Sequence, residues 1–338
     1  MRIPHINLDG ASGGMPNSVA ALIANGADLS ALRTHALLQK DEWKKLDDTV
    51  VRIARKRLRV VGDLLGRGLR YDLADALGTM IFEYETESDM NPAVINMTGK
   101  ARGGNDTVNY ELTGLPIPIT SKFWELNARR LRASRKRGES LDTTQAAVAA
   151  RKVAEALEQL TMVGSYTDDE KGAAQTIAYG TYTVYGLENH TSVNTGSLVG
   201  AWDDDSARDP KTDVLAMVQA CVDVQMYGPF GIYVPREYST ALGDDYVNTT
   251  STTITVQERL QKIPGVEFIQ VQDYATATKI TLFQLDEQTV RIVHGQDPTP
   301  VEWKSGDAMT LYHKVMAIMV PQVRADQDGN CGIAVYSE

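Results

Sequence analysis

The 338-residue chain contains few cysteines and no long apolar run, and each absence narrows what it can be. Two cysteines, Cys221 and Cys331, are too few for a disulfide scaffold or a four-cysteine zinc site, so we expect two unpaired thiols. The most apolar run, 315–320, is far shorter than the roughly 20 residues of a membrane helix. The first residues lack the charged start and apolar block of a secretory signal. We therefore expect a protein that is made and used in the cytoplasm without a membrane partner.

The sequence also lacks the short motifs of catalytic and metal chemistry. It has no phosphate-binding Gly-x-x-x-x-Gly-Lys-Ser/Thr loop and no Gly-x-Ser-x-Gly elbow. Asp326, Asp328 and Gly329 resemble the start of a calcium loop, but the glutamate that completes one is absent. The acidic run 203–205 fits an exposed loop better than a cation site. Five histidines form no His-x-x-x-His or Glu-x-x-His pair: His5, His35, His190, His294 and His313. The sequence thus predicts no enzyme, no cofactor, and no catalytic, cofactor-binding or metal-binding residue.

The charge is divided unevenly along the chain. Residues 1–152 hold 23 Lys and Arg against 18 Asp and Glu, whereas residues 153–338 hold 11 against 26. A basic N-terminal half on a chain of net charge -10 argues against a dedicated nucleic-acid-binding protein, which usually has a strongly basic face. It suits copies that dock on one another, basic segment against acidic segment. Solvated faces that meet no partner are the alternative explanation.

The first 80 residues divide into an arm and a helical region. Residues 1–40 contain a glycine-rich stretch without a long periodic pattern, which indicates an extended arm. Between residues 41 and 77, apolar residues recur at three- and four-residue spacing and predict helix. Gly66 and Gly68 are expected to break or kink it.

Two features in the middle of the sequence are strongly patterned. Apolar and polar residues alternate over 81–87, and extended chain returns over 108–120, after a tip rich in glycine and asparagine. This pattern predicts a long hairpin whose proline-containing second strand is an edge strand or an inter-subunit strand. Asp142 and Thr143 are suitable N-cap residues for the alanine-rich helix that follows, and Gly164 is a suitable C-cap.

The rest of the sequence predicts a mixture of short helices and strands around a polar loop over 186–202. The predicted helices cover 213–226 and 256–260. The predicted strands cover 177–185, 232–234, 266–271, 280–285, 290–293, 314–323 and 332–336. The turn sequence 326–330 predicts that the last two strands form a hairpin.

Several segments resemble one family of shell proteins. The stretch Leu115 to Glu155 is similar to the strand and spine-helix region shared by phage capsid proteins and bacterial encapsulins. Four further blocks follow in the family's order, and together they cover most of residues 80–320. They are Tyr185-Gly-Leu-Glu-Asn-His with Trp202, the helix at 213–226 with Tyr227-Gly-Pro-Phe-Gly-Ile-Tyr-Val-Pro, Glu258-Arg-Leu-Gln-Lys-Ile-Pro-Gly-Val, and Val293-His-Gly-Gln-Asp.

The resemblance implies an α+β Hong Kong 97-type capsid fold, as in the major capsid proteins of tailed bacteriophages. Such a fold has an N-terminal arm, an extended hairpin called the E-loop, a long spine helix, a peripheral domain and an axial domain. Its spine helix would cover 142–163. The implied segments are the arm 1–40, a helical part of the peripheral domain 41–79, the E-loop 80–120, the peripheral domain with the spine helix 121–164, the axial domain 165–310 and a return to the peripheral domain 311–338.

The same resemblance implies a structural protein that assembles through homo-pentamers and homo-hexamers into an icosahedral phage head. The head would enclose double-stranded DNA, which the subunits would contact non-specifically. Portal, scaffolding and decoration proteins would be further partners, in a virion capsid assembled in the bacterial host cytoplasm. Some family members link subunits by a Lys–Asn isopeptide bond, for which Lys100 and Asn330 would be the candidates. An encapsulin shell around a protein cargo and a soluble α/β enzyme with an unrecognised site remain alternatives.

Overall fold

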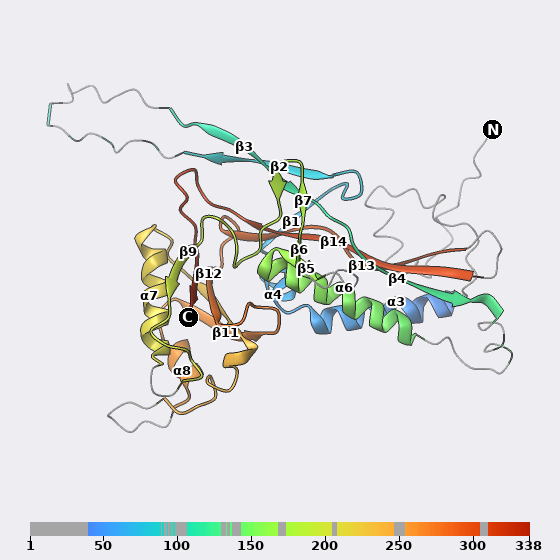
Figure 1. Ribbon diagram of the computed structural model, residues 1–338. Helices are drawn as coiled ribbons and strands as arrows, with labels where there is room; N and C mark the ends of the chain where they lie inside the picture. The colour runs from blue at the N-terminus through green and yellow to red at the C-terminus, as the bar shows by residue number, and fades with distance from the viewer. Residues whose placement is uncertain are drawn as a thin grey trace.

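The computed structural model is an elongated molecule with two lobes and a projecting hairpin (Figure 1). It describes residues 40–338 apart from several segments, so the predicted arm, the hairpin tip, Lys100 and Asp142 lie outside the described residues. The omitted segments are 89, 91–92, 94, 96, 99–106, 130–132, 134–135, 137–142, 168–173, 205–207, 247–253 and 305–309.

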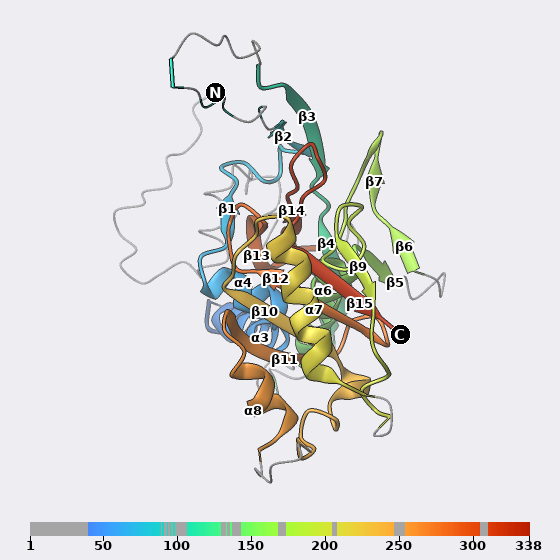
Figure 2. The ribbon, with the colours of Figure 1, turned by 90° about the vertical axis from the view of Figure 1, so that its left-hand side faces the viewer.

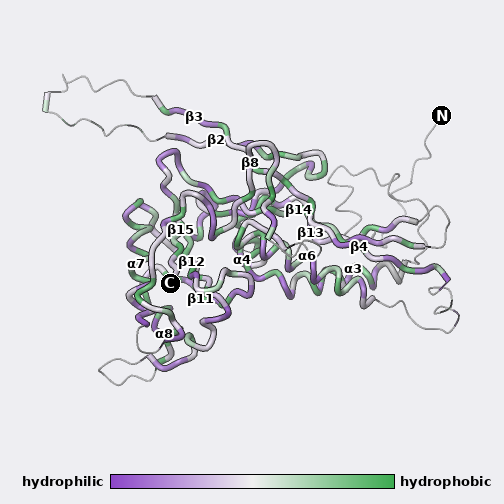
Figure 3. Tube along the Cα trace, in the orientation of Figure 1, coloured by the Kyte–Doolittle hydropathy of each residue, from purple (hydrophilic) through white to green (hydrophobic). Residues whose placement is uncertain are grey.

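The first lobe packs helices against one face of a four-stranded sheet. Its helices are α3 (Lys40–Arg57), α4 (Val60–Gly66) and α6 (Thr144–Val163). Its strands, in sheet order, are β1 (Arg70–Asp72), β13 (Val290–Lys304), β14 (Thr310–Val323) and β4 (Thr120–Asn127). β14 runs antiparallel to both of its neighbours. The alternate residues Leu311, Val315, Ala317 and Met319 of β14 join the buried cluster that also contains the apolar residues of α3 and α6. Figure 3 shows hydrophilic and hydrophobic residues alternating around the turns of α3 and α6.

The second lobe is built on a five-stranded sheet with two helices. In sheet order its strands are β11 (Val266–Gln272), β10 (Phe230–Pro235), β12 (Lys279–Gln284), β15 (Ile333–Ser337) and β9 (Asn194–Ser197). The helices are α7 (Pro210–Asp223) and α8 (Val256–Gln261). Their apolar residues, with Trp202 and Tyr238, form a second buried cluster against this sheet. Successive side chains of β10 point to opposite faces of the sheet, and the side chains on both faces are buried. β10 is therefore buried along its whole length.

The projecting hairpin consists of β2 (Ile81–Glu87) and β3 (Tyr110–Pro116), as the sequence predicts. Smaller elements between α6 and the second lobe are β5 (Ser165–Thr167), β6 (Ala174–Thr176), β7 (Ala178–Tyr179) and β8 (Tyr182–Thr183), and the 3₁₀ turn η2 (Arg236–Tyr238) follows β10 within the second lobe. In Figure 2 the hairpin rises above both lobes.

The predicted spine helix is confirmed over 144–163, but its start is not capped as expected. Thr143 occupies the N-cap position without a side-chain cap bond, because its backbone (ψ 7°) is not extended as a capping residue requires. At the other end Gly164 has φ +67° and donates its N–H to the Leu160 carbonyl, the predicted glycine cap.

Five predictions of secondary structure are wrong in whole or in part. The helical region predicted to about residue 77 breaks at Gly66 and Gly68, as expected of these glycines, but it does not resume, because the chain turns at Gly68 (φ +80°) into β1. The strand 177–185 is a small hairpin, β7 and β8, which turns at Gly180 (φ +64°). The loop 186–202 contains β9, which pairs with β15 in parallel.

The last two strands do not form a hairpin, which is the fourth correction. β14 pairs with β13 and β4, whereas β15 joins the other sheet beside β12. The turn 326–330 exists, but it connects the two lobes. β13 is also much longer than the predicted 290–293, and it lies in the sheet of the first lobe.

Candidate assembly surfaces

The hairpin presents a surface that is largely uncovered in the part of the chain that the structure describes. Within the part of the chain that the structure describes, β2 and β3 pair only with each other, in register from Ile81↔Pro116 to Glu87↔Tyr110. Isolated two-stranded hairpins are marginally stable in water. This hairpin therefore depends on further contacts, either at its root or from another molecule.

One face of the hairpin is both acidic and apolar. Glu83, Glu85 and Glu87 lie on it and are exposed. Opposite the last two lie Leu112 (56% exposed) and Tyr110 (62% exposed). Beyond the paired strands, Ile95 is 96% exposed. Exposed apolar side chains gathered with charges on one face are typical of a protein interaction surface.

Contacts on both faces anchor the root of the hairpin, beginning with aromatic rings on the face opposite the glutamates. The rings of Phe82 and Tyr71 lie 4.8 Å apart, and Phe82 is 6.2 Å from Tyr84. On the face that carries the glutamates, Gly114 pairs with Glu83 and lies directly against the ring of Tyr182, because a Cβ at this position would come within 2.7 Å of that ring. Only glycine permits this close approach of β3 to β8.

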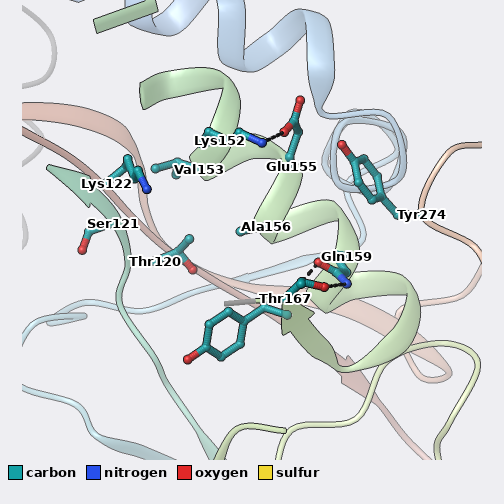
Figure 4. A pocket seen from close by; sticks show the side chains of 11 residues that line it. Thr120, Ser121, Lys122, Lys152, Val153, Glu155, Ala156, Gln159, Thr167 and Tyr274 are labelled. Atoms are coloured by element: carbon teal, nitrogen blue, oxygen red, sulfur yellow. Dashed lines mark hydrogen bonds and ion pairs between the residues drawn. The ribbon is translucent and has the colours of Figure 1, made fainter. Parts of the chain in front are cut away.

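A second candidate surface is a groove between β4 and α6 (Figure 4). The groove has a volume of about 520 Å³, and β4 is an edge strand of its sheet. Lys122 comes from β4, and Lys152 comes from α6, where it pairs with Glu155 at 3.2 Å. The other lining residues are Thr120, Ser121, Val153, Ala156, Gln159, Tyr166, Thr167 and Tyr274. With two lysines and one glutamate, the groove is basic and polar.

Buried carboxyl groups join the two lobes. Glu158 of α6 accepts hydrogen bonds from the N–H groups of Val60 (3.0 Å) and Val61 (3.1 Å), at the start of α4, and from Gln272 of β11 (2.6 Å). Glu188 accepts from the N–H of Thr276, 3.1 Å from each carboxyl oxygen. These hydrogen bonds lower the pKa of both glutamates, but burial raises it by more, so both pKa values are about 7. Sequence reasoning missed both residues, whose partners lie far away in the chain.

The histidines and cysteines behave as packing or structural residues where the structure describes them. Cys221 and Cys331 are both free, as predicted, and both are buried. His294 lies between Asp72 (3.1 Å) and Asp297 (3.2 Å), and its hydrogen bond to Asp297 is the main contact that raises its pKa.

His313 is buried on the helix-facing side of β14. Its ring stacks on Trp124 with the centroids 5.2 Å apart, and burial lowers its pKa to about 4. His5 and His35 lie outside the described residues.

The candidate cation and cross-link residues have other contacts. Asp326 accepts from the backbone and side-chain amides of Asn330, both at 2.7 Å, so this segment is a closed turn. Among the described residues, no group of His, Cys, Asp and Glu could hold a metal ion. No described helix is long and apolar enough to cross a membrane.

A family model described as a family of unknown function, DUF6260, matches residues 31–337. The chain belongs to this family. No curated protein matches this DUF6260 chain.

Solved structures establish the fold of the DUF6260 chain. A virus-like particle from Pyrococcus furiosus matches with 16% identity and a TM-score of 0.59, over 87% of this chain and 99% of that one. The capsid of Myoviridae phage XM1 matches with 10% identity and a TM-score of 0.60, over 80% and 90% of the two chains. The capsid of a native GTA particle matches with 11% identity and a TM-score of 0.56, over 90% and 92%. The predicted α+β, Hong Kong 97-type capsid fold is confirmed.

Proposed function

We propose that this chain is a structural shell protein whose copies assemble through pentamers and hexamers into an icosahedral phage head around double-stranded DNA. The observation that carries the proposal is the hairpin, which exposes Leu112 and Tyr110 on the part of its face that no other described residue covers. A second molecule can cover this face, and a repeated subunit is the simplest source. Many such weak contacts, repeated around a closed shell, add up to a stable particle.

The charge of the two surfaces supports a specific pairing between neighbours. The exposed face of the hairpin carries Glu83, Glu85 and Glu87, whereas Lys122 and Lys152 line the groove beside β4. Complementary charges fix the register of an interface and favour correct partners. In our proposal the hairpin of one subunit lies across the groove of its neighbour.

Three further parts of the proposal follow from shell assembly. The protein acts without catalysis, and its fold neighbours form capsids and a virus-like particle. Its place is the virion capsid, assembled in the cytoplasm of a bacterial host. Its partners are a portal protein, scaffolding or decoration proteins, and the packaged DNA, which it contacts non-specifically.

Expression of the full chain tests the proposal directly. Size-exclusion chromatography and negative-stain electron microscopy should reveal closed shells or ring-shaped pentamers and hexamers. The particle diameter and contents then separate a DNA-filled phage head from an encapsulin shell around a protein cargo. A chain that stays monomeric at high concentration, even with a scaffolding protein present, would overturn the proposal in favour of a soluble enzyme.

Charge reversal tests the pairing of hairpin and groove. Glu85→Lys or Lys152→Glu alone should abolish or slow assembly, because each places like charges opposite one another. Combining the two changes should restore shells, since the opposite charges meet again with exchanged positions. Glu237→Lys makes the same charge change at an exposed site away from the hairpin and serves as the control. Failure of the combined variant to assemble better than either single variant would refute the pairing.

A further inference from the structure

The connection between β14 and β15 reaches the hairpin. Figures 1 and 2 both show this segment rising from the lobes to the strands β2 and β3. Its tip is the turn 326–330, which the sequence predicts only as a link between two strands. The turn therefore brings residues near the end of the chain to a structure formed by residues 81–116.

The turn is closed by its own hydrogen bonds. Asp326 accepts from both amide groups of Asn330 at 2.7 Å, and the N–H of Gly329 donates to the Asp326 carbonyl at 3.1 Å. Gly329 has φ +83°, which suits glycine. The next residue, Cys331, is fully buried, and its carbonyl accepts from the side chain of Asn194 at 2.8 Å. The turn is thus a preformed structure held on the second lobe.

Gln327 connects this turn to both strands of the hairpin. Its side-chain amide donates to the carbonyl of Thr86, on β2, at 2.9 Å and to the carbonyl of Asn109, just before β3, at 3.0 Å. Its backbone N–H donates to the Glu87 carbonyl at 3.4 Å. Ser88 also donates to Asn109, so Gln327 contacts the hairpin close to where its pairing ends. One side chain with two N–H donors can bridge two strands in this way, whereas a carboxylate cannot donate at all.

The hairpin is consequently held at two separate points. The root is fixed where Gly114 lies against Tyr182. The second point is Gln327, which contacts Thr86 and Glu87, three and four residues along β2 from Glu83, the partner of Gly114, or about 10–13 Å away. A rod attached at one point can swing, whereas attachment at two points fixes its direction.

We propose that Gln327 is a positioning residue that fixes the direction in which the hairpin leaves the subunit before a neighbour is met. The inference rests on the proposed role of the hairpin in assembly. A hairpin held in one direction loses less conformational entropy on docking. A fixed hairpin direction also restricts the angle between neighbouring subunits, and this angle sets the curvature of a closed shell. Loss of Gln327 should leave the fold intact, slow assembly and widen the range of particle diameters.

Distance measurement on the unassembled chain tests the contact without requiring a shell. Spin labels at Tyr110→Cys on the hairpin and Leu215→Cys on α7 report the direction of the hairpin, because both positions are exposed and both native cysteines are buried. Gln327→Ala and Gln327→Glu should at least double the width of the distance distribution. Amide exchange over 84–88 should become roughly three- to tenfold faster, the size expected for one lost hydrogen bond. Asp328→Ala, an exposed neighbour in the same turn, is the control and should change neither quantity.

The outcomes separate the two proposals. An unchanged distance distribution and unchanged exchange in both Gln327 variants would overturn the positioning role, whatever the wild-type chain assembles into. A wider distribution with unchanged assembly rate and particle diameters would overturn its role in assembly and leave the shell function standing. A wild-type chain that forms no shells would refute the shell function, and the distance measurement would still decide whether Gln327 holds the hairpin. The thermal midpoint should stay within a few degrees of wild type, which distinguishes a positioning role from general destabilisation.

Discussion

Replacing Glu158 with glutamine should remove a large part of the pH dependence of stability between pH 5 and 8. Glu158 is 1% exposed, and three N–H donors surround its carboxyl group: two from the first turn of α4 and one from Gln272. Burial nevertheless raises its pKa from the ordinary 4.5 to about 7. The folded chain therefore holds this proton more tightly than the unfolded chain does.

The sign and size of the effect follow from this difference. A carboxyl group with a raised pKa contributes stability that is complete below pH 4.5 and is lost as the pH rises through 7. The separation of about 2.5 pKa units corresponds to roughly 3 kcal/mol, at 1.36 kcal/mol per unit. Glutamine stays neutral at every pH, so this contribution disappears. The variant should also lose about 1–3 kcal/mol at pH 5, because its NH₂ group faces donors that need an acceptor.

Urea unfolding of the full chain, at fixed ionic strength and in one assembly state, measures the effect. Wild type should lose stability from pH 5 to 8, whereas Glu158→Gln should lose about 3 kcal/mol less over the same range. Glu155→Gln removes the same kind of charge from the same helix, where Glu155 pairs with Arg151 and Lys152, and serves as the control. Glu188→Gln should flatten the profile further, because burial also raises the pKa of Glu188 to about 7. A Glu158→Gln profile parallel to that of wild type would refute the reasoning.

Three further changes test the packing. Gly164→Ala should cost about 3 kcal/mol or more in urea unfolding, because φ is +67° and the new Cβ would lie 2.4 Å from the Gly186 nitrogen; a loss under about 1 kcal/mol would contradict this. Trp202→Phe should cost about 1–3 kcal/mol, because Asp213 loses a buried donor at 2.8 Å. His313→Phe should move acid unfolding to lower pH. Burial lowers the pKa of the His313 imidazole to about 4, so wild type loses stability as the pH falls below 6.5, and phenylalanine removes this loss. An unchanged midpoint would count against this explanation.

Much of the local structure was predictable from sequence patterns. Alternation over 81–87 identified β2, and the periodic alanine-rich run closed by Gly164 identified α6. The helices α7 and α8 and the strands β10, β11 and β12 were also found close to their observed bounds. These predictions succeeded because each depends on the spacing of neighbouring residues, which the sequence displays directly. The order of such patterns also carried the resemblance to capsid proteins.

The contacts that support the candidate assembly surfaces were not predictable in this way. In the sequence Glu158 is one more glutamate on a helix. The groups that donate hydrogen bonds to it lie 98 and 114 residues away along the chain. Gln327 lies 241 residues from Thr86, and nothing in its neighbourhood marks it as a contact to a hairpin. The last two strands look like a hairpin locally, but they lie in different sheets.

The sequence by itself determined which segments are helix or strand, the uneven charge, and the absence of short catalytic and metal motifs. Only the tertiary structure decided which strands pair, which glutamates are buried and what holds the hairpin. The reason is physical. Local periodicity is set by backbone geometry within a few residues, whereas strand order and buried hydrogen bonds depend on which distant surfaces exclude water together.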